Sequence, residues 1–198
     1  MDDDTANEIL DGTYRALCKH GYAELTLQDI ADETDKSKAS IHYYYDTKED
    51  LFTAFLEFLY GRYTDKVTGV TGASPQARLL SLLDVLLADG EDGPDTEFRT
   101  AMLEIRAQGP YNDGIREQLT KFDEFLYGEL HSIIEAGIER EEFNEHVDPD
   151  LAAEFLTTMI SGAHTRRVAV DYSMDRLHET VRTYVEQHLS PEPPEVSH

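Results

Sequence analysis

The segment 26–51, with the sequence TLQDIADETDKSKASIHYYYDTKEDL, limits the possible folds of this chain more than any other feature. Its apolar residues follow helical spacing in two short runs, separated by a break at residues 34–35. Thr26 and Ser37 precede these runs and are residue types that favour the N-cap of a helix. Thr47, a third residue of this kind, follows soon afterwards. The segment therefore predicts two short helices joined by a tight turn, with a third helix starting directly after them.

The second of these helices has an outer face that is poorly suited to burial. Ile41 and Tyr45 are four residues apart, so both are expected to face the core. The side chains left outside are small, hydroxyl, amine, imidazole or phenol groups: Lys38, Ala39, Ser40, His42 and Tyr43. Small residues permit close approach to the major groove of DNA, and polar ones reach base edges and phosphates. The segment therefore predicts a helix-turn-helix.

Net charge is the feature that fits DNA binding least. The chain has 41 acidic and 17 basic residues, a formal net charge of −24, which is the wrong sign for approaching phosphates. Residues 36–45, however, contain two lysines, one histidine and no acid. Scarce lysine and abundant acid indicate an organism with a very salty cytoplasm, where at about 1 M salt the Debye length is roughly 3 Å. The alternative is an acidic surface that binds a basic protein partner.

Other features favour a cytoplasmic protein. The single cysteine, Cys18, excludes an intrachain disulfide, and its place beside Leu17 favours burial over redox sensing. Residues 1–8 are acidic, which does not fit a signal peptide. The most apolar run, residues 79–88, is too short to span a bilayer, so we expect no membrane contact.

Helical periodicity continues along the chain and predicts an all-α fold of about nine helices. Besides the two short helices, we expect helices over residues 3–20, 48–67, 95–108, 112–140, 149–170 and 174–189, and a leucine-rich one that Ser74 and Pro75 open. Gly21 is expected to end the first helix. Residues 191–198 are rich in proline and acid and are expected to be disordered.

Catalytic and metal-binding motifs are weak. His131 and Glu135 are four residues apart and His164 lies on a later helix, but no H-x-x-x-H or C-x-x-C pair occurs. A chain this rich in acid produces such His/Glu pairs by chance. There is also no G-x-S-x-G motif and no glycine-rich phosphate loop. We expect no metal, no cofactor and no enzymatic activity.

The sequence resembles the TetR family of transcriptional regulators. The resemblance is carried by HGY at the end of the first helix and by LTLQDIADETDKSKASIHYYYDTKEDLF, and it covers about residues 5–60. Residues 133–162, IIEAGIEREEFNEHVDPDLAAEFLTTMISG, are a weaker match. The resemblance implies a homodimer with two N-terminal DNA-reading modules, a ligand cavity and a four-helix dimer interface. Under it, residues 1–47 form the DNA-binding domain, residues 48–190 the ligand-binding and dimerisation domain, and residues 191–198 a tail.

The resemblance also implies a role for each matching residue. Phosphate contacts are expected from Thr26, Tyr43, Tyr44 and Lys48, and Lys48 stands at a helix N-terminus. Base edges are expected to lie against Gln28, Lys38, Ala39, Ser40 and His42. Ser37 is also included among the DNA-binding residues. Two residues depart from the family pattern. Asp35 stands where the family usually has glycine, so it is expected to adopt a left-handed backbone. Asp46 stands where a basic residue is common and weakens the basic character of the DNA face.

Two further sets of candidates lie in the second domain. The ligand cavity is expected among Phe98, Met102, Ile105, Phe122, Phe125, Met159 and His164, although the same residue types line ordinary cores. The last two helices carry more apolar surface than one core needs, which predicts a homodimer interface. Its candidate residues are Leu151, Phe155, Met159, Leu177, Val181 and Tyr184.

Two functions are compatible with this sequence. The first is a dimeric repressor that a small molecule releases from its DNA operator by changing the spacing of the two recognition helices. The alternative is a helical dimeric adaptor that binds a metabolite or protein and kept the fold without operator binding. An adaptor has no reason to keep residues 36–45 free of acids, so this segment favours the repressor.

Overall fold

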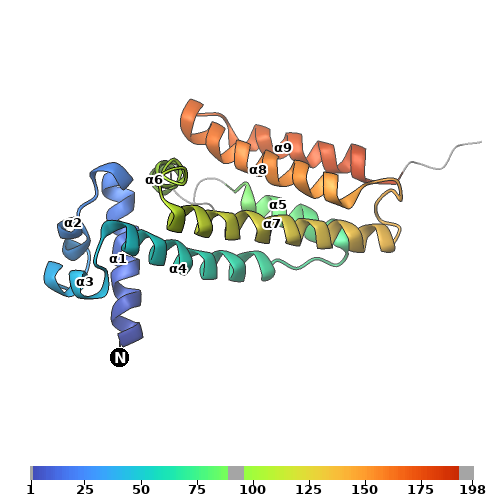
Figure 1. Cartoon of the computed structure of the whole chain (residues 1–198). Coiled ribbons are helices and arrows are strands. Elements are labelled where there is room, and N and C mark those ends of the chain that lie inside the picture. Colours follow the sequence, from blue (N-terminus) through green and yellow to red (C-terminus); the bar gives the residue numbers. More distant parts are fainter. Residues whose placement is uncertain (1, 89–95, 192–198) are drawn as a thin grey trace, which may run out of the picture. The chain divides into compact units, whose positions relative to one another are not determined.

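The computed structural model describes residues 2–88 and 96–191 (Figure 1). Over these residues the chain forms nine α-helices and one π-helical segment and contains no strand, which confirms the all-α prediction. The elements are α1 (Asp2–Glu24), α2 (Leu27–Asp32), α3 (Lys38–Tyr44), α4 (Lys48–Thr68), α5 (Pro75–Leu86), α6 (Thr96–Arg106), α7 (Asp113–Glu139), α8 (Pro149–Val170), α9 (Met174–Tyr184) and η2 (Val185–Leu189). No helix within the described ranges is long and apolar enough to cross a membrane.

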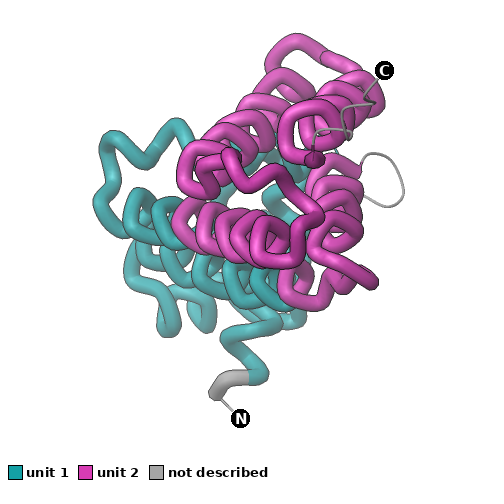
Figure 2. The backbone as a smooth tube through the Cα atoms, turned by 90° about the vertical axis from the view of Figure 1, so that its right-hand side faces the viewer, with its two compact units in different colours: residues 1–65, 94–122 teal, residues 66–93, 123–198 magenta. Residues whose placement is uncertain are grey.

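The chain divides into two compact units (Figure 2). Unit 1 comprises residues 1–65 and 94–122, and unit 2 comprises residues 66–93 and 123–198. Unit 1 is larger than the predicted DNA-binding domain, residues 1–47, because α6 and most of α4 pack with α1 to α3. The boundary between the functional domains remains a prediction. The predicted tail, residues 191–198, lies outside the described residues except for residue 191.

Unit 1 has one hydrophobic core to which each of its helices contributes. Its fully buried side chains include Ile9 and Leu17 of α1, Ile30 of α2, Ile41 of α3 and Phe52 and Phe55 of α4. Ala101 and Ile105 of α6 lie in the same core, and Phe98 and Met102 pack against it. This differs from the prediction that Phe98, Met102 and Ile105 line a ligand cavity. The three residues instead hold α6 against the common core of unit 1.

Unit 2 is a helical bundle with its own core. Its buried residues include Leu79, Leu82 and Leu83 of α5, Leu130, Ile133 and Ile134 of α7, Leu156 and Ile160 of α8, and Leu177 and Val181 of α9. Leu177 is 8% exposed and Val181 is 0% exposed. They therefore complete the core of one chain and do not present a surface to a second copy, contrary to the prediction that they belong to a dimer interface.

Two backbone expectations have opposite outcomes. Gly21 has φ 71° and ψ 172°, so it interrupts α1, in agreement with the predicted end of the first helix. Asp35 does not adopt the left-handed backbone that was predicted, because the positive φ angles of the described residues are confined to Gly21, Glu141 and Asp171. The Thr34 side chain instead organises this turn: its hydroxyl accepts a hydrogen bond from the Lys36 N–H at 3.2 Å.

Candidate nucleic-acid interface

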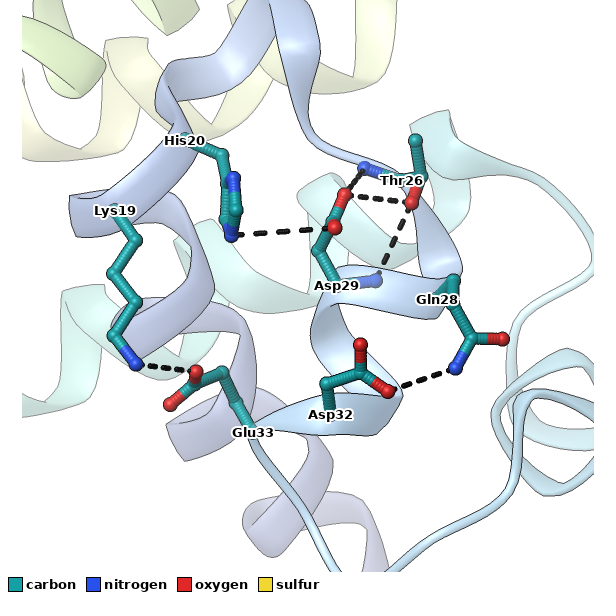
Figure 3. Close-up of polar contacts among 7 residues, drawn as sticks. All are labelled: Lys19, His20, Thr26, Gln28, Asp29, Asp32 and Glu33. Atoms are coloured by element: carbon teal, nitrogen blue, oxygen red, sulfur yellow. Dashed lines mark hydrogen bonds and ion pairs between the residues drawn. The ribbon is translucent and has the colours of Figure 1, made fainter.

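Reciprocal caps fix where α2 and α4 begin. Thr26 accepts a hydrogen bond from the Asp29 N–H at 3.3 Å, and the Asp29 carboxylate accepts one from the Thr26 N–H at 2.8 Å (Figure 3). The Thr26 hydroxyl also donates to this carboxylate at 2.6 Å, and the bond holds the pKa of Asp29 below its ordinary value. Thr47 and Asp50 repeat the arrangement at α4, with 3.1 Å for each of the two backbone bonds. Both are capping boxes of the T-x-x-D type.

Further polar contacts tie α2 to α1 (Figure 3). The Lys19 amine lies 2.5 Å from the Glu33 carboxylate, and His20 lies 4.0 Å from Asp29. Gln28, a predicted base contact, donates its side-chain amide to Asp32 at 2.8 Å. The polar groups of Thr26 and Gln28 are thus engaged within the protein. For these two residues the structure shows a structural role beside the predicted contact to DNA.

The outer face of α3 is the most accessible part of the helix-turn-helix. Ser37 caps this helix by accepting a hydrogen bond from the Ser40 N–H at 3.1 Å. Ile41 is fully buried, while Ser40, Tyr44 and Tyr45 are partly buried and both tyrosines pack against the unit 1 core. Lys38, Ala39, His42 and Tyr43 are exposed, with Tyr43 at 84%. These four residues, which we call the α3 outer face, lie together as predicted, whereas Tyr44 is less accessible than the others.

The lysines of this region have different environments. The Lys36 amine forms an ion pair with Glu8 of α1 at 2.8 Å, and this hydrogen bond raises the pKa of Lys36 and lowers that of Glu8. Lys38 has no ion-pair or hydrogen-bond partner for its amine among the residues that the structure describes. The positive charge predicted for the DNA face is therefore reduced to one unpaired lysine per chain in residues 36–45.

Lys48 is held inside unit 1. Its amine donates to the Tyr22 carbonyl at 2.6 Å and lies 4.5 Å from the centre of the Tyr22 ring. Burial lowers the pKa of Lys48, although the nearby carboxylates of Glu49 and Glu104 act in the opposite direction. The same peptide of the chain is held from α6, because the Glu104 carboxylate accepts hydrogen bonds from the N–H groups of Tyr22 at 2.6 Å and Ala23 at 3.3 Å.

This arrangement revises the expected role of Lys48. The sequence places its amine on a phosphate, but the structure uses it, together with Glu104, to clamp the last residues of α1, just after the kink at Gly21. Neither Glu104 nor Glu8 was among the predicted functional residues. Glu104 lies 82 residues from Tyr22 in the chain, and no local sequence pattern reveals such a pairing.

Of the seven ligand candidates, four lie in unit 1 and three in unit 2. Phe122 contacts the rings of Tyr60 and Tyr63 at 5.3 and 5.4 Å between centroids. Phe125 and Met159 are half-buried, and the His164 ring bonds the Leu86 carbonyl at 2.9 Å. A hollow in unit 2 has none of the seven in its lining, which consists of Asn144, His146, Val147, Asp148, Leu151, Ala152, Tyr184, His188 and Leu189.

Among the predicted dimer residues, Leu151 and Phe155 are exposed. They are one helical turn apart on α8, at 69% and 40% exposure. The Phe155 ring stacks on Tyr184 of α9 at 4.3 Å between centroids. Met159 and Tyr184 are half-buried. Leu151, Phe155 and Tyr184 thus form an apolar strip on unit 2.

Comparison with known proteins places these features in a family. The family model for "Bacterial regulatory proteins, tetR family" matches residues 9–55, and the model for "BetI-type transcriptional repressor, C-terminal" matches residues 75–190. A TetR transcription regulator from Haloarcula marismortui has a crystal structure with a TM-score of 0.88 and 40% identity, over 95% of this chain and 100% of that one.

More distant relatives agree with this result. The HTH-type transcriptional repressor AcnR of Corynebacterium glutamicum is 23% identical over 177 residues, which are 88% of this chain and 87% of the relative. A transcriptional regulator from Saccharomonospora viridis, solved in complex with choline, has a TM-score of 0.83 at 22% identity, over 95% of this chain and 98% of that one. At this identity the likeness concerns the fold alone.

We predict that Lys48→Met and Lys38→Met separate structural from DNA-binding roles. Lys48→Met removes the donor to the half-buried Tyr22 carbonyl and should lower the free energy of unfolding by about 1 kcal/mol. Lys38→Met should leave stability unchanged and weaken DNA binding. Chemical denaturation and gel shifts in molar KCl measure both. If Lys48→Met leaves stability unchanged but weakens binding to all sequences alike, Lys48 is a phosphate contact instead.

Proposed function

This chain belongs to the TetR family of transcriptional regulators, and we propose that it is a repressor that a small molecule releases from its operator. As a member of this family, the chain is a DNA-binding regulator. The observation that carries it is the α3 outer face. This face is free of acid and exposed, on a chain with a net charge of −24.

DNA contact through the α3 outer face follows from its side chains. Ala39 and the half-buried Ser40 leave room for close approach to a groove, while Lys38 and His42 present polar groups one helical turn apart. Tyr43 can reach a phosphate, because its phenol is almost wholly exposed. We assign base contacts to Lys38, Ala39, Ser40 and His42. Thr26, Gln28, Ser37, Tyr44 and Lys48 support the geometry and are secondary candidates for contacts.

The proposed effector is a small molecule. The transcriptional regulator from Saccharomonospora viridis was solved with choline, and another regulator of similar fold, FadR of Bacillus subtilis, was solved with stearoyl-CoA. A small cation and a long acyl thioester need different cavities, so these relatives support ligand control without pointing to one ligand. Within unit 2 we assign a part of the site to Phe125, Met159 and His164. The effector favours a state in which the two recognition helices no longer fit successive major grooves.

The working form is a homodimer that acts in a salty cytoplasm. The apolar strip of Leu151, Phe155 and Tyr184 supplies surface for a second copy, and two-fold symmetry brings the same strip from each chain together. The acidic composition and the similarity to a Haloarcula regulator support a setting of high salt. In molar salt the repulsion between this acidic protein and DNA is screened beyond about 3 Å.

We predict that operator binding persists in molar salt. A binding site should first be selected from random double-stranded DNA at about 2 M KCl. Each neutralised phosphate lowers log K by about 0.9 per log unit of salt, and each chain has one unpaired lysine on the α3 outer face. The slope between about 0.5 and 2 M KCl should therefore lie between zero and about −2 per dimer. A slope of about −6 or steeper contradicts this picture, and failure to select any sequence favours an adaptor without operator binding.

The dimer is tested by Phe155→Asp. A carboxylate in the apolar strip should dissociate the homodimer at micromolar concentration, because it would be buried without a partner. Thr120→Asp, on an exposed position of α7, is the control and should stay dimeric. Light scattering in molar KCl gives the mass of each. A wild-type protein that is monomeric at micromolar concentration rules out the proposed assembly.

A further inference from the structure

The imidazole ring of His42 is held in a fixed orientation on the α3 outer face. Its Nδ1 atom lies 3.2 Å from the carbonyl oxygen of Tyr45, just beyond the end of the helix. The side chain is otherwise exposed, and it lies one turn from Lys38. Ile41, the neighbour of His42 in the sequence, is fully buried, so the backbone that carries the ring is anchored in the core.

The contact with Tyr45 determines which ring nitrogen carries hydrogen. A carbonyl oxygen can only accept, so Nδ1 must be the donor in this hydrogen bond. A neutral imidazole has one N–H, and the other nitrogen is an acceptor. In the neutral ring with this contact, Nε2 therefore carries a lone pair and is the atom left for a ligand.

An acceptor at this position selects a particular class of base. In the major groove the hydrogen-bond donors of bases are the exocyclic amines of adenine and cytosine, whereas guanine and thymine offer acceptors. We propose that His42 is a specificity-determining residue that accepts a hydrogen bond at Nε2 from the exocyclic amine of an adenine or a cytosine. This inference rests on the proposed function, since it requires that the α3 outer face enters a major groove.

The neighbouring Lys38 has the opposite character. Its ammonium only donates, and guanine O6 and N7 are its best partners in the groove. The two side chains, one turn apart, thus form an ordered pair of a donor and an acceptor. Such a pair distinguishes a guanine next to an amine-bearing base from the same bases in the reverse order.

The test uses an operator selected from random DNA and base analogues within it. The base pair read by His42 is the one whose preference disappears in His42→Ala. If the amine-bearing base of this pair is adenine, replacing it with 2-aminopurine removes the amine from the major groove. Binding of the wild type should then weaken about 5-fold, as expected for the loss of one hydrogen bond. Replacing it with 7-deazaadenine, which lacks only N7, should leave binding unchanged. If the base is cytosine, 2-pyrimidinone takes the place of 2-aminopurine.

Variants separate this role from a structural one. His42→Ala should be insensitive to both analogues, and His42→Gln, which can accept and donate, should regain the amine requirement and become sensitive to loss of N7. His20→Ala, at the other exposed histidine of unit 1, should behave as the wild type does.

Each outcome is decisive. Wild-type binding that is unchanged by loss of the amine, a dependence on N7 instead of the amine, or a His42→Ala variant with unchanged base preferences overturns the inference. In these cases sequence-specific binding survives, and only the role of His42 is wrong. If no sequence-specific binding is found at all, the proposed function fails as well.

Discussion

The two capping boxes at Thr26 and Thr47 determine where α2 and α4 begin, and the position of α3 depends on both. A helix of seven residues is too short to be stable alone, because nucleation costs more than one turn of hydrogen bonds returns. Its stability comes from the burial of Ile41, from the packing of Tyr44 and Tyr45, and from the fixed helices on either side. The outer face of α3 is therefore free to carry residues that contribute nothing to folding.

Several charged side chains of unit 1 form ion pairs or hydrogen bonds within the protein. Glu8 pairs with Lys36 and Glu33 pairs with Lys19, while Glu104 accepts from the backbone N–H of Tyr22 and Lys48 donates to its carbonyl. Carboxylates thus engage Lys19 and Lys36, the Tyr22 carbonyl engages Lys48, and the α3 outer face is left with one amine. Affinity for DNA must then come mainly from base edges, backbone N–H groups and shape, which salt screens weakly.

Local patterns in the sequence predict the local features of the fold. The caps at Thr26, Ser37 and Ser74 and the break at Gly21 were all expected, because each depends on residues within a few positions. Contacts between residues far apart in the sequence could not be predicted from such local patterns. Periodicity indicated that Ile105 and Val181 are apolar positions of helices, but not that one faces the core of unit 1 and the other the core of unit 2. The same limit explains Lys48, whose partner Tyr22 is 26 residues away. The wrong prediction for Asp35 has a local cause, because the Thr34 hydroxyl organises this turn without a left-handed residue.

The central claim is that the α3 outer face docks on DNA in high salt, and Ala39→Glu tests it most directly. Ala39 is exposed in the middle of this face, so a glutamate there adds bulk and negative charge without disturbing the core. Ala107→Glu, at an exposed position after α6, adds the same charge elsewhere. Gel shifts with a selected operator at about 2 M KCl should show that Ala39→Glu binds at least about 10-fold more weakly, since one good base contact is worth about 1–3 kcal/mol. Ala107→Glu should bind as the wild type does. Equal binding by both variants would contradict the account.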